Sequence, residues 1–158
     1  MFAQLIDRIS GALATPEADT SGEDREAAIR KATAVLMIDV ARADSVFDPS
    51  EFDSVFDRIS AHFGLTGQEA AELVNSADEE AERLTSLHDF TQLLHANLDE
   101  NEKSSVIGLL WEVAYADGRL DKYEDSLVLK ISDLLHVSRG RVMRLKHDAE
   151  NGDGSGAA

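Results

Sequence analysis

Apolar residues recur at spacings of three and four along most of this chain, the pattern of helices that bury one face. In residues 2–13 this pattern predicts an amphipathic helix, and segment 14–22, with its Thr, Pro, Ser and Gly, is typical of a linker. The helix lacks the basic polar face of helices that bind membrane surfaces, so we expect it to dock on the protein's own core. No segment shows the sustained apolar–polar alternation of a half-buried strand. The pattern therefore predicts an all-α fold, a bundle of about seven to eight helices.

Most of the later helices have a recognisable start signal. In a capping box, a side chain at the helix start accepts a backbone hydrogen bond, and an acidic residue three positions later returns one. Thr66 with Glu69, and Asp99 with Glu102, are such pairs. Gly64 suits the position after a helix C-terminus, where glycine adopts a left-handed backbone without strain. The predicted helices begin near Ser21, Asp48, Thr66, Ser86, Asp99, Asp121 and Ser138.

Residues 39–51 and 112–124 form an internal repeat, which we call the first and second acidic stretches. Four carboxylates are in register, each 73 residues from its counterpart. They pair as Asp39 with Glu112, Asp44 with Asp117, Asp48 with Asp121, and Glu51 with Glu124. Beyond the stretches the register continues with a slip of one residue, since Ile59-Ser60 matches Ile131-Ser132. We therefore expect each half to be helix, acidic stretch, helix, turn and helix, and the two halves to pack with approximate two-fold symmetry.

The clustered carboxylates make both stretches candidate metal sites. Asp39 and Glu112 fall in the last turn of a predicted helix, where a negative charge opposes the helix dipole. Several like charges close together are unfavourable unless water or a cation compensates them. Hard divalent ions prefer all-oxygen ligands, and neither stretch contains Cys or His. The predicted ion is therefore Ca²⁺, Mg²⁺ or Mn²⁺ rather than Zn²⁺, with all eight carboxylates as candidate ligands.

The second stretch resembles the calcium loop of an EF-hand only in part. Asp117 and Gly118 fit the fifth and sixth positions of that loop, and Asp121 and Glu124 fit the ninth and twelfth, but the first and third positions hold the non-ligands Val113 and Tyr115. An ordinary EF-hand is therefore excluded.

An alternative explanation needs no metal. The last two carboxylates of each stretch are also spaced as a capping box for the helix that follows. This explains Asp48, Glu51, Asp121 and Glu124 and leaves Asp39, Asp44, Glu112 and Asp117 without a structural role.

Composition narrows the possible partners. Among 158 residues, 31 are acidic and 15 basic, for a formal net charge of −16. Nucleic acid and anionic membranes are disfavoured partners, whereas cations and basic protein surfaces are favoured. There is no cysteine, which excludes disulfides, thiolate metal sites and cysteine nucleophiles. Without an apolar run long enough to span a bilayer, or a secretory signal at the N-terminus, a cytoplasmic location is expected. The sequence gives no indication of the oligomeric state.

No pattern points to catalysis. There is no nucleophile elbow and no glycine-rich phosphate loop. His88 and His95 lie seven apart, a spacing more typical of solvated or capping side chains than of a helical metal pair. Trp111 is expected in the core, while Tyr115 fits either the core or an exposed anchor for a partner. We therefore expect a non-enzymatic protein.

The phrase Val-Ala-Tyr-Ala-Asp-Gly-Arg-Leu-Asp-Lys-Tyr-Glu, at 113–124, resembles the signature of the tellurite-resistance TerB family. The resemblance covers about 29–147 and includes both stretches. It implies an all-helical domain with internal pseudo-symmetry and an acidic cluster proposed to bind divalent metal. By position, the implied ligands are Asp39, Asp44, Glu51, Glu112, Asp117 and Glu124. The first stretch departs from the pattern at Ser45, where the second has Gly118.

The expected organisation is an N-terminal helix and linker over 1–23, a TerB-like domain over 24–149, and a flexible tail over 150–158. The repeat copies occupy about 29–80 and 102–149. The leading functional hypothesis is a TerB-like domain that binds a divalent cation and engages protein partners in a stress-related role. The alternatives are a scaffold domain without metal and, third, a metal-dependent hydrolase that uses both acidic stretches as a two-metal site.

Overall fold

The computed structural model describes residues 22–43, 49–83, 86–116 and 122–151, and within these residues it contains helices and turns but no strand. The predicted all-α class is confirmed. The predicted N-terminal helix, the linker and the tail beyond 151 lie outside the described residues.

The described helices are α2 (Gly22–Ala41), α3 (Pro49–Phe63), α4 (Gly67–Arg83), α5 (His88–Asn97), α6 (Glu100–Ala114), α7 (Lys122–Leu134) and α8 (Arg139–Asn151). None of them has the length and hydropathy needed to cross a lipid bilayer.

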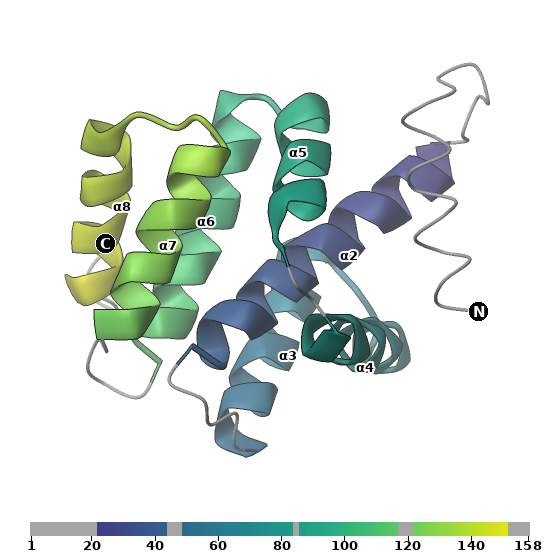
Figure 1. The fold of residues 1–158 in the computed structure, drawn as a ribbon. Coiled ribbons are helices and arrows are strands. Elements are labelled where there is room, and N and C mark those ends of the chain that lie inside the picture. Colours follow the sequence, from purple (N-terminus) through teal and green to yellow (C-terminus); the bar gives the residue numbers. More distant parts are fainter. Residues whose placement is uncertain (1–21, 44–48, 84–85, 117–121, 152–158) are drawn as a thin grey trace.

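Helix α2 is the centre of the bundle. Every residue from Lys31 to Ile38 is buried, so this part of the helix is surrounded on all sides rather than laid on the core by one face. Helices α3, α4, α5, α6 and α7 all contact it, and Figure 1 shows it running diagonally between α4 and the α6–α7 pair. The sequence pattern predicted helices that bury one face, whereas the structure buries Met37 and Ile38 as well as Val35 and Val40.

Helix α6 is the second long buried element. It packs against α2, α3, α7 and α8. Trp111, predicted to be in the core, is fully buried on this helix, and the ammonium of Lys146 from α8 lies 5.3 Å from its ring centroid. Tyr115 is half-buried, with its ring centroid 6.5 Å from that of Trp111, so it packs at the edge of the core.

The helices of the two halves contact one another in equivalent ways. Helix α2 contacts α3 and α4 as α6 contacts α7 and α8, and the halves meet through α2 with α6, α2 with α7, and α3 with α6. This arrangement is what a two-fold relation between the halves requires, and the pseudo-symmetry itself stays a prediction.

Capping boxes start two of the helices as the sequence predicted. The backbone N–H of Glu69 donates to Thr66 Oγ1 at 3.1 Å, and the N–H of Thr66 donates to the Glu69 carboxylate at 2.9 Å. The same pair of bonds joins Asp99 and Glu102, both at 2.8 Å. Each box satisfies two backbone donors that the helix start leaves free.

Helices α3 and α7 end in the same way. Gly64 (φ 65°), the first residue after α3, and His136 (φ 62°), the second residue after α7, both adopt the left-handed conformation. In each case the next residue closes the turn, since Leu65 N–H donates to Ser60 O at 3.0 Å and Val137 N–H donates to Ser132 O at 3.2 Å. These are the bonds of a Schellman motif. The predicted C-terminal role of Gly64 is confirmed, whereas histidine was not expected in the same role.

Replacing Gly64 by Ala should lower the free energy of unfolding by about 1 kcal/mol, because a Cβ strains a left-handed residue. A Cβ there would meet no other atom within 4 Å, so the strain is in the backbone alone. Gly140→Ala is the matched control, since Gly140 also has open space around it but lies inside α8. It should raise stability by about 0.5 kcal/mol. Urea unfolding measures both, and an equal effect of the two substitutions would contradict the assigned conformation.

Lys31 places a cation inside the apolar contact between α2 and α4. Its side chain is almost fully buried, and its ammonium donates to Ser76 Oγ at 2.6 Å. Burial lowers the pKa of Lys31 to about 8, against the opposing effect of the nearby Glu80 and Glu79 carboxylates. The folded protein therefore holds this proton less tightly than the unfolded chain does.

Stability should rise with pH above about 8 because of Lys31. The unfolded side chain keeps a pKa near 10.5 while the folded one deprotonates near 8, so between these values the unfolded state binds more protons and raising the pH favours folding. Over this interval we expect the wild type to gain up to about 3 kcal/mol relative to Lys31→Met, measured by urea unfolding at successive pH values. Lys122→Met, at an exposed lysine, should follow the wild type. Parallel curves for wild type and Lys31→Met would show that burial does not perturb this amine.

Candidate functional site

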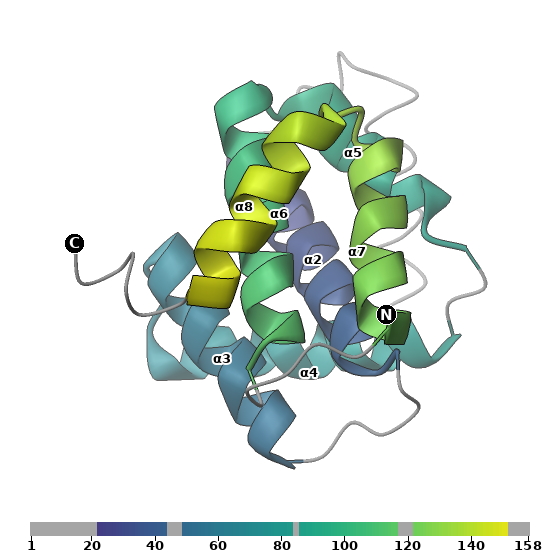
Figure 2. The ribbon, with the colours of Figure 1, turned by 90° about the vertical axis from the view of Figure 1, so that its left-hand side faces the viewer.

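The helix ends that flank the two acidic stretches lie at one end of the bundle. Helices α2 and α6 pack against each other and both end there, and α3 and α7 both begin there, at the lower end in Figure 1 and Figure 2. Asp39 is in the last turn of α2 and Glu112 in the last turn of α6, as predicted. Glu124 is in the first turn of α7.

The structure describes three of the eight predicted metal ligands in full: Asp39, Glu112 and Glu124. The others are Asp44, Asp48, Asp117 and Asp121, which lie outside the described residues, and Glu51, whose side chain is not described.

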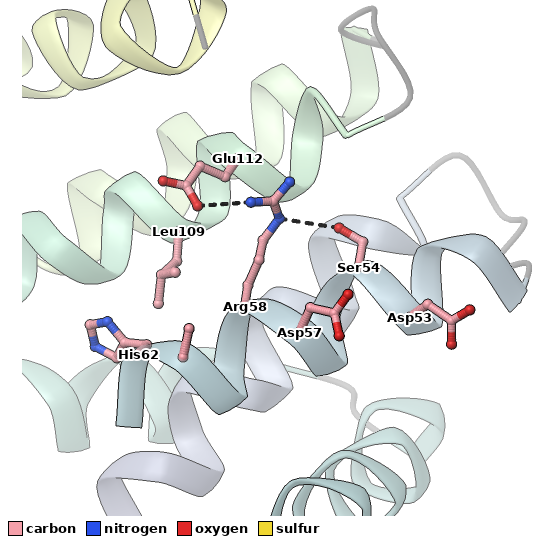
Figure 3. A pocket seen from close by; sticks show the side chains of 8 residues that line it. Asp53, Ser54, Asp57, Arg58, His62, Leu109 and Glu112 are labelled. Atoms are coloured by element: carbon pink, nitrogen blue, oxygen red, sulfur yellow. Dashed lines mark hydrogen bonds and ion pairs between the residues drawn. The ribbon is translucent and has the colours of Figure 1, made fainter. Parts of the chain in front are cut away.

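Glu112 faces the first half of the chain. Its carboxylate forms an ion pair with Arg58 of α3, at 3.0 Å between Oε1 and Nη1. The Nε of Arg58 also donates to Ser54 Oγ, one turn earlier on α3, at 3.1 Å. Figure 3 shows the guanidinium held between these two oxygens. A cation could use both oxygens of Glu112 only by displacing Arg58.

Asp39 faces the second half of the chain. It lines a shallow groove between the end of α2 and the start of α7, which also includes Tyr123, Ser126 and Lys130. Burial raises the pKa of Asp39, and the positive charges of Arg42 and Lys130 act in the opposite direction. Part of the hydration that stabilises this carboxylate has therefore been replaced by protein.

The basic partners of these acids are in register within the repeat. Arg58 and Lys130 are 72 residues apart, the same offset as Ile59 and Ile131. Each lies on the helix after an acidic stretch and faces the last-turn carboxylate of the other half. These residues cannot be found from the acidic positions alone, although the register that pairs them is present in the sequence.

Glu124 is buried, with 4% of its surface exposed. A carboxylate in the first turn of a helix is stabilised by the helix dipole. Its predicted capping partner, Asp121, lies outside the described residues, so the capping box stays a prediction.

Among the described residues, no three His, Asp or Glu side chains come close enough together to hold a metal ion. Asp39 and Glu112 line different grooves and face different helices. The described residues of the two stretches therefore do not form a shared coordination set.

A second groove lies between α3 and α6, with a volume of about 710 Å³. We call it the α3–α6 groove. Its lining residues are Asp53, Ser54, Asp57, Arg58, Ala61, His62, Leu109 and Glu112. Burial lowers the pKa of His62, which the nearby Glu112 carboxylate opposes.

The Arg58–Glu112 pair should contribute little to stability, because both side chains are partly solvated, at 33% and 47% exposure. A double-mutant cycle with Arg58→Gln and Glu112→Gln should give a coupling free energy between 0.2 and about 1 kcal/mol in urea unfolding. The more exposed Arg139–Asp133 pair, at 54% and 63%, is the matched control and should give less. A zero coupling for Arg58–Glu112 would mean that the two side chains do not hold each other in solution.

A comparison with protein-family models finds one family that matches most of this chain. The model described as "Tellurite resistance protein TerB" matches residues 30–147. This range covers both acidic stretches, helices α3 to α7, and all of α2 and α8 except residues 22–29 and 148–151.

No curated protein and no solved structure matches the chain significantly. The family match covers well over half of the 158 residues and agrees with the resemblance seen in the sequence. The chain therefore belongs to the TerB family, as a tellurite-resistance-related helical domain.

Proposed function

We propose that this chain is a non-enzymatic TerB domain that binds a divalent cation at its acidic stretches and engages protein partners in a stress-related role. The observation that carries the metal part is that Asp39 and Glu112 occupy the last turns of two adjacent helices that end on the same side of the bundle. The first residues of α3 and α7 also lie at this end.

Each of these positions is unfavourable for a bare carboxylate. The C-terminal end of a helix carries partial negative charge, so Asp39 and Glu112 oppose it. Asp39 is in addition partly desolvated. A bound cation offsets both effects. Oxygen ligands alone favour Ca²⁺, Mg²⁺ or Mn²⁺.

The basic side chains near these acids set a limit on affinity. Arg58 already neutralises Glu112, and Arg42 and Lys130 partly neutralise Asp39. A cation competes with them, so we expect modest binding. The Arg58–Glu112 pair is also the observation that favours the second candidate, a scaffold domain whose carboxylates serve as caps and ion pairs. The two-metal hydrolase finds no support among the described residues, since Asp39 and Glu112 line separate grooves.

Thermal unfolding of chelator-treated protein with added Ca²⁺, Mg²⁺ or Mn²⁺ separates the two candidates. A ligand at 100 times its dissociation constant adds about 2.7 kcal/mol of stability. In a domain of this size, that amounts to several degrees in melting temperature. We expect the metal ions to raise the melting temperature of the wild type but not that of Asp117→Asn. The variant Asp44→Asn tests in the same way whether the first stretch binds the ion.

The control for charge alone is Asp89→Asn, at an exposed aspartate on α5 far along the chain from both stretches. It should keep the full metal-dependent rise. No rise with any of the three ions would leave the scaffold domain as the function, and an equal loss in Asp89→Asn would mean that the ions act through general charge screening.

A further inference from the structure

The α3–α6 groove carries negative charge that the protein itself does not neutralise. Asp53 and Asp57 are exposed on its α3 wall, and neither has a hydrogen-bond or ion-pair partner among the described residues. Arg58, the one permanently cationic side chain of the lining, is already paired with Glu112. The groove therefore attracts cations, even though an arginine forms part of it.

The inner end of the groove is suited to the stem of a long basic side chain. Ala61 and Leu109 supply apolar lining, and Figure 3 shows Leu109 between Glu112 and His62, away from Asp53 and Asp57. Lys and Arg lay their methylene stems on apolar surface while the charged head reaches polar groups. Burial lowers the pKa of His62 and so favours its neutral imidazole, which does not repel a cation.

The spacing of the acids fits a helical ligand. Asp53 and Asp57 are four residues apart on α3, which places them one turn apart on the same side, about 5–6 Å between Cβ atoms. Lysines at the same spacing on a second helix match this pitch. Glu112 on the opposite wall adds a third acidic contact through the carboxylate oxygen that does not bind Arg58.

We propose that the α3–α6 groove docks a basic helical segment of a partner protein, which presents Lys or Arg side chains one turn apart to Asp53 and Asp57. The net charge of −16 disfavours nucleic acid, an anionic membrane or a second copy of this chain as the occupant. The proposal rests on the protein-binding part of the proposed function and is independent of the metal part.

The test uses two blocked, fluorescently labelled 16-residue peptides made of twelve alanines and four lysines. In the first peptide the lysines are four residues apart, and in the second they are contiguous. Fluorescence anisotropy titrations in low salt with a chelator present measure the dissociation constants. We expect the spaced peptide to bind at least threefold more tightly than the block peptide, because only its lysines match the pitch of the acids.

Two double variants locate the binding. Asp53→Asn/Asp57→Asn removes the acids of the groove, and Asp89→Asn/Asp148→Asn removes two exposed aspartates on α5 and α8 with the same change in net charge. The first should weaken binding of the spaced peptide about fivefold or more, and the second less than twofold. Thermal unfolding verifies that both variants fold.

Three results would overturn the proposal: no binding of the spaced peptide, equal affinity for the two peptides, or equal weakening by the two double variants. The last would show that the peptide responds to the general acidic field. The chelator removes divalent ions, so the outcome of the peptide titrations is independent of whether the acidic stretches bind metal.

Discussion

The burial of α2 is the constraint on which the rest of the fold depends. A helix with eight consecutive buried residues needs apolar partners on every side, and five other described helices supply them. Removal of apolar surface from water is the main favourable term in folding, so this helix fixes where its neighbours lie. The arrangement brings the ends of α2 and α6 together and thereby sets the positions of Asp39 and Glu112.

The two halves of the chain are joined by charge as well as by the core. Glu112 in the second half pairs with Arg58 in the first, and Asp39 in the first half faces Lys130 in the second. Glu112 thus takes its counter-charge from the opposite half, and Asp39 is compensated by Arg42 of its own half together with Lys130 of the opposite half. A change in one acidic stretch is therefore felt by the helix that follows the other stretch.

The elements of the fold were largely predictable from local patterns. Capping boxes at Thr66 and Asp99 and the helix end at Gly64 are encoded by neighbouring residues, so the sequence alone located them. His136 shows the limit of that approach, because it adopts the left-handed backbone conformation that glycine favours. Its ring centroid lies 4.4 Å from that of His95, a contact that no local pattern predicts.

For the candidate site, the sequence located Asp39 and Glu112 at helix ends but not what they face. The ion pair of Glu112 joins residues 54 apart in the chain, and helical periodicity contains no information on such contacts. The burial of residues 31–38 of α2 on all sides was missed for the same reason, since it depends on how many helices surround them.

The order of the helices along the chain has a consequence for biosynthesis. The most deeply buried helix precedes all of its described partners, and the last of those that cover it ends at Leu134. At the ribosome, residues appear at about 5–20 per second, so α2 waits on the order of ten seconds before its cover is complete. During that interval the apolar residues of α2 are exposed to water or to a chaperone. The nascent chain is then most prone to aggregation, because the helices that cover these residues and carry acidic side chains on their outer faces have not all been synthesised.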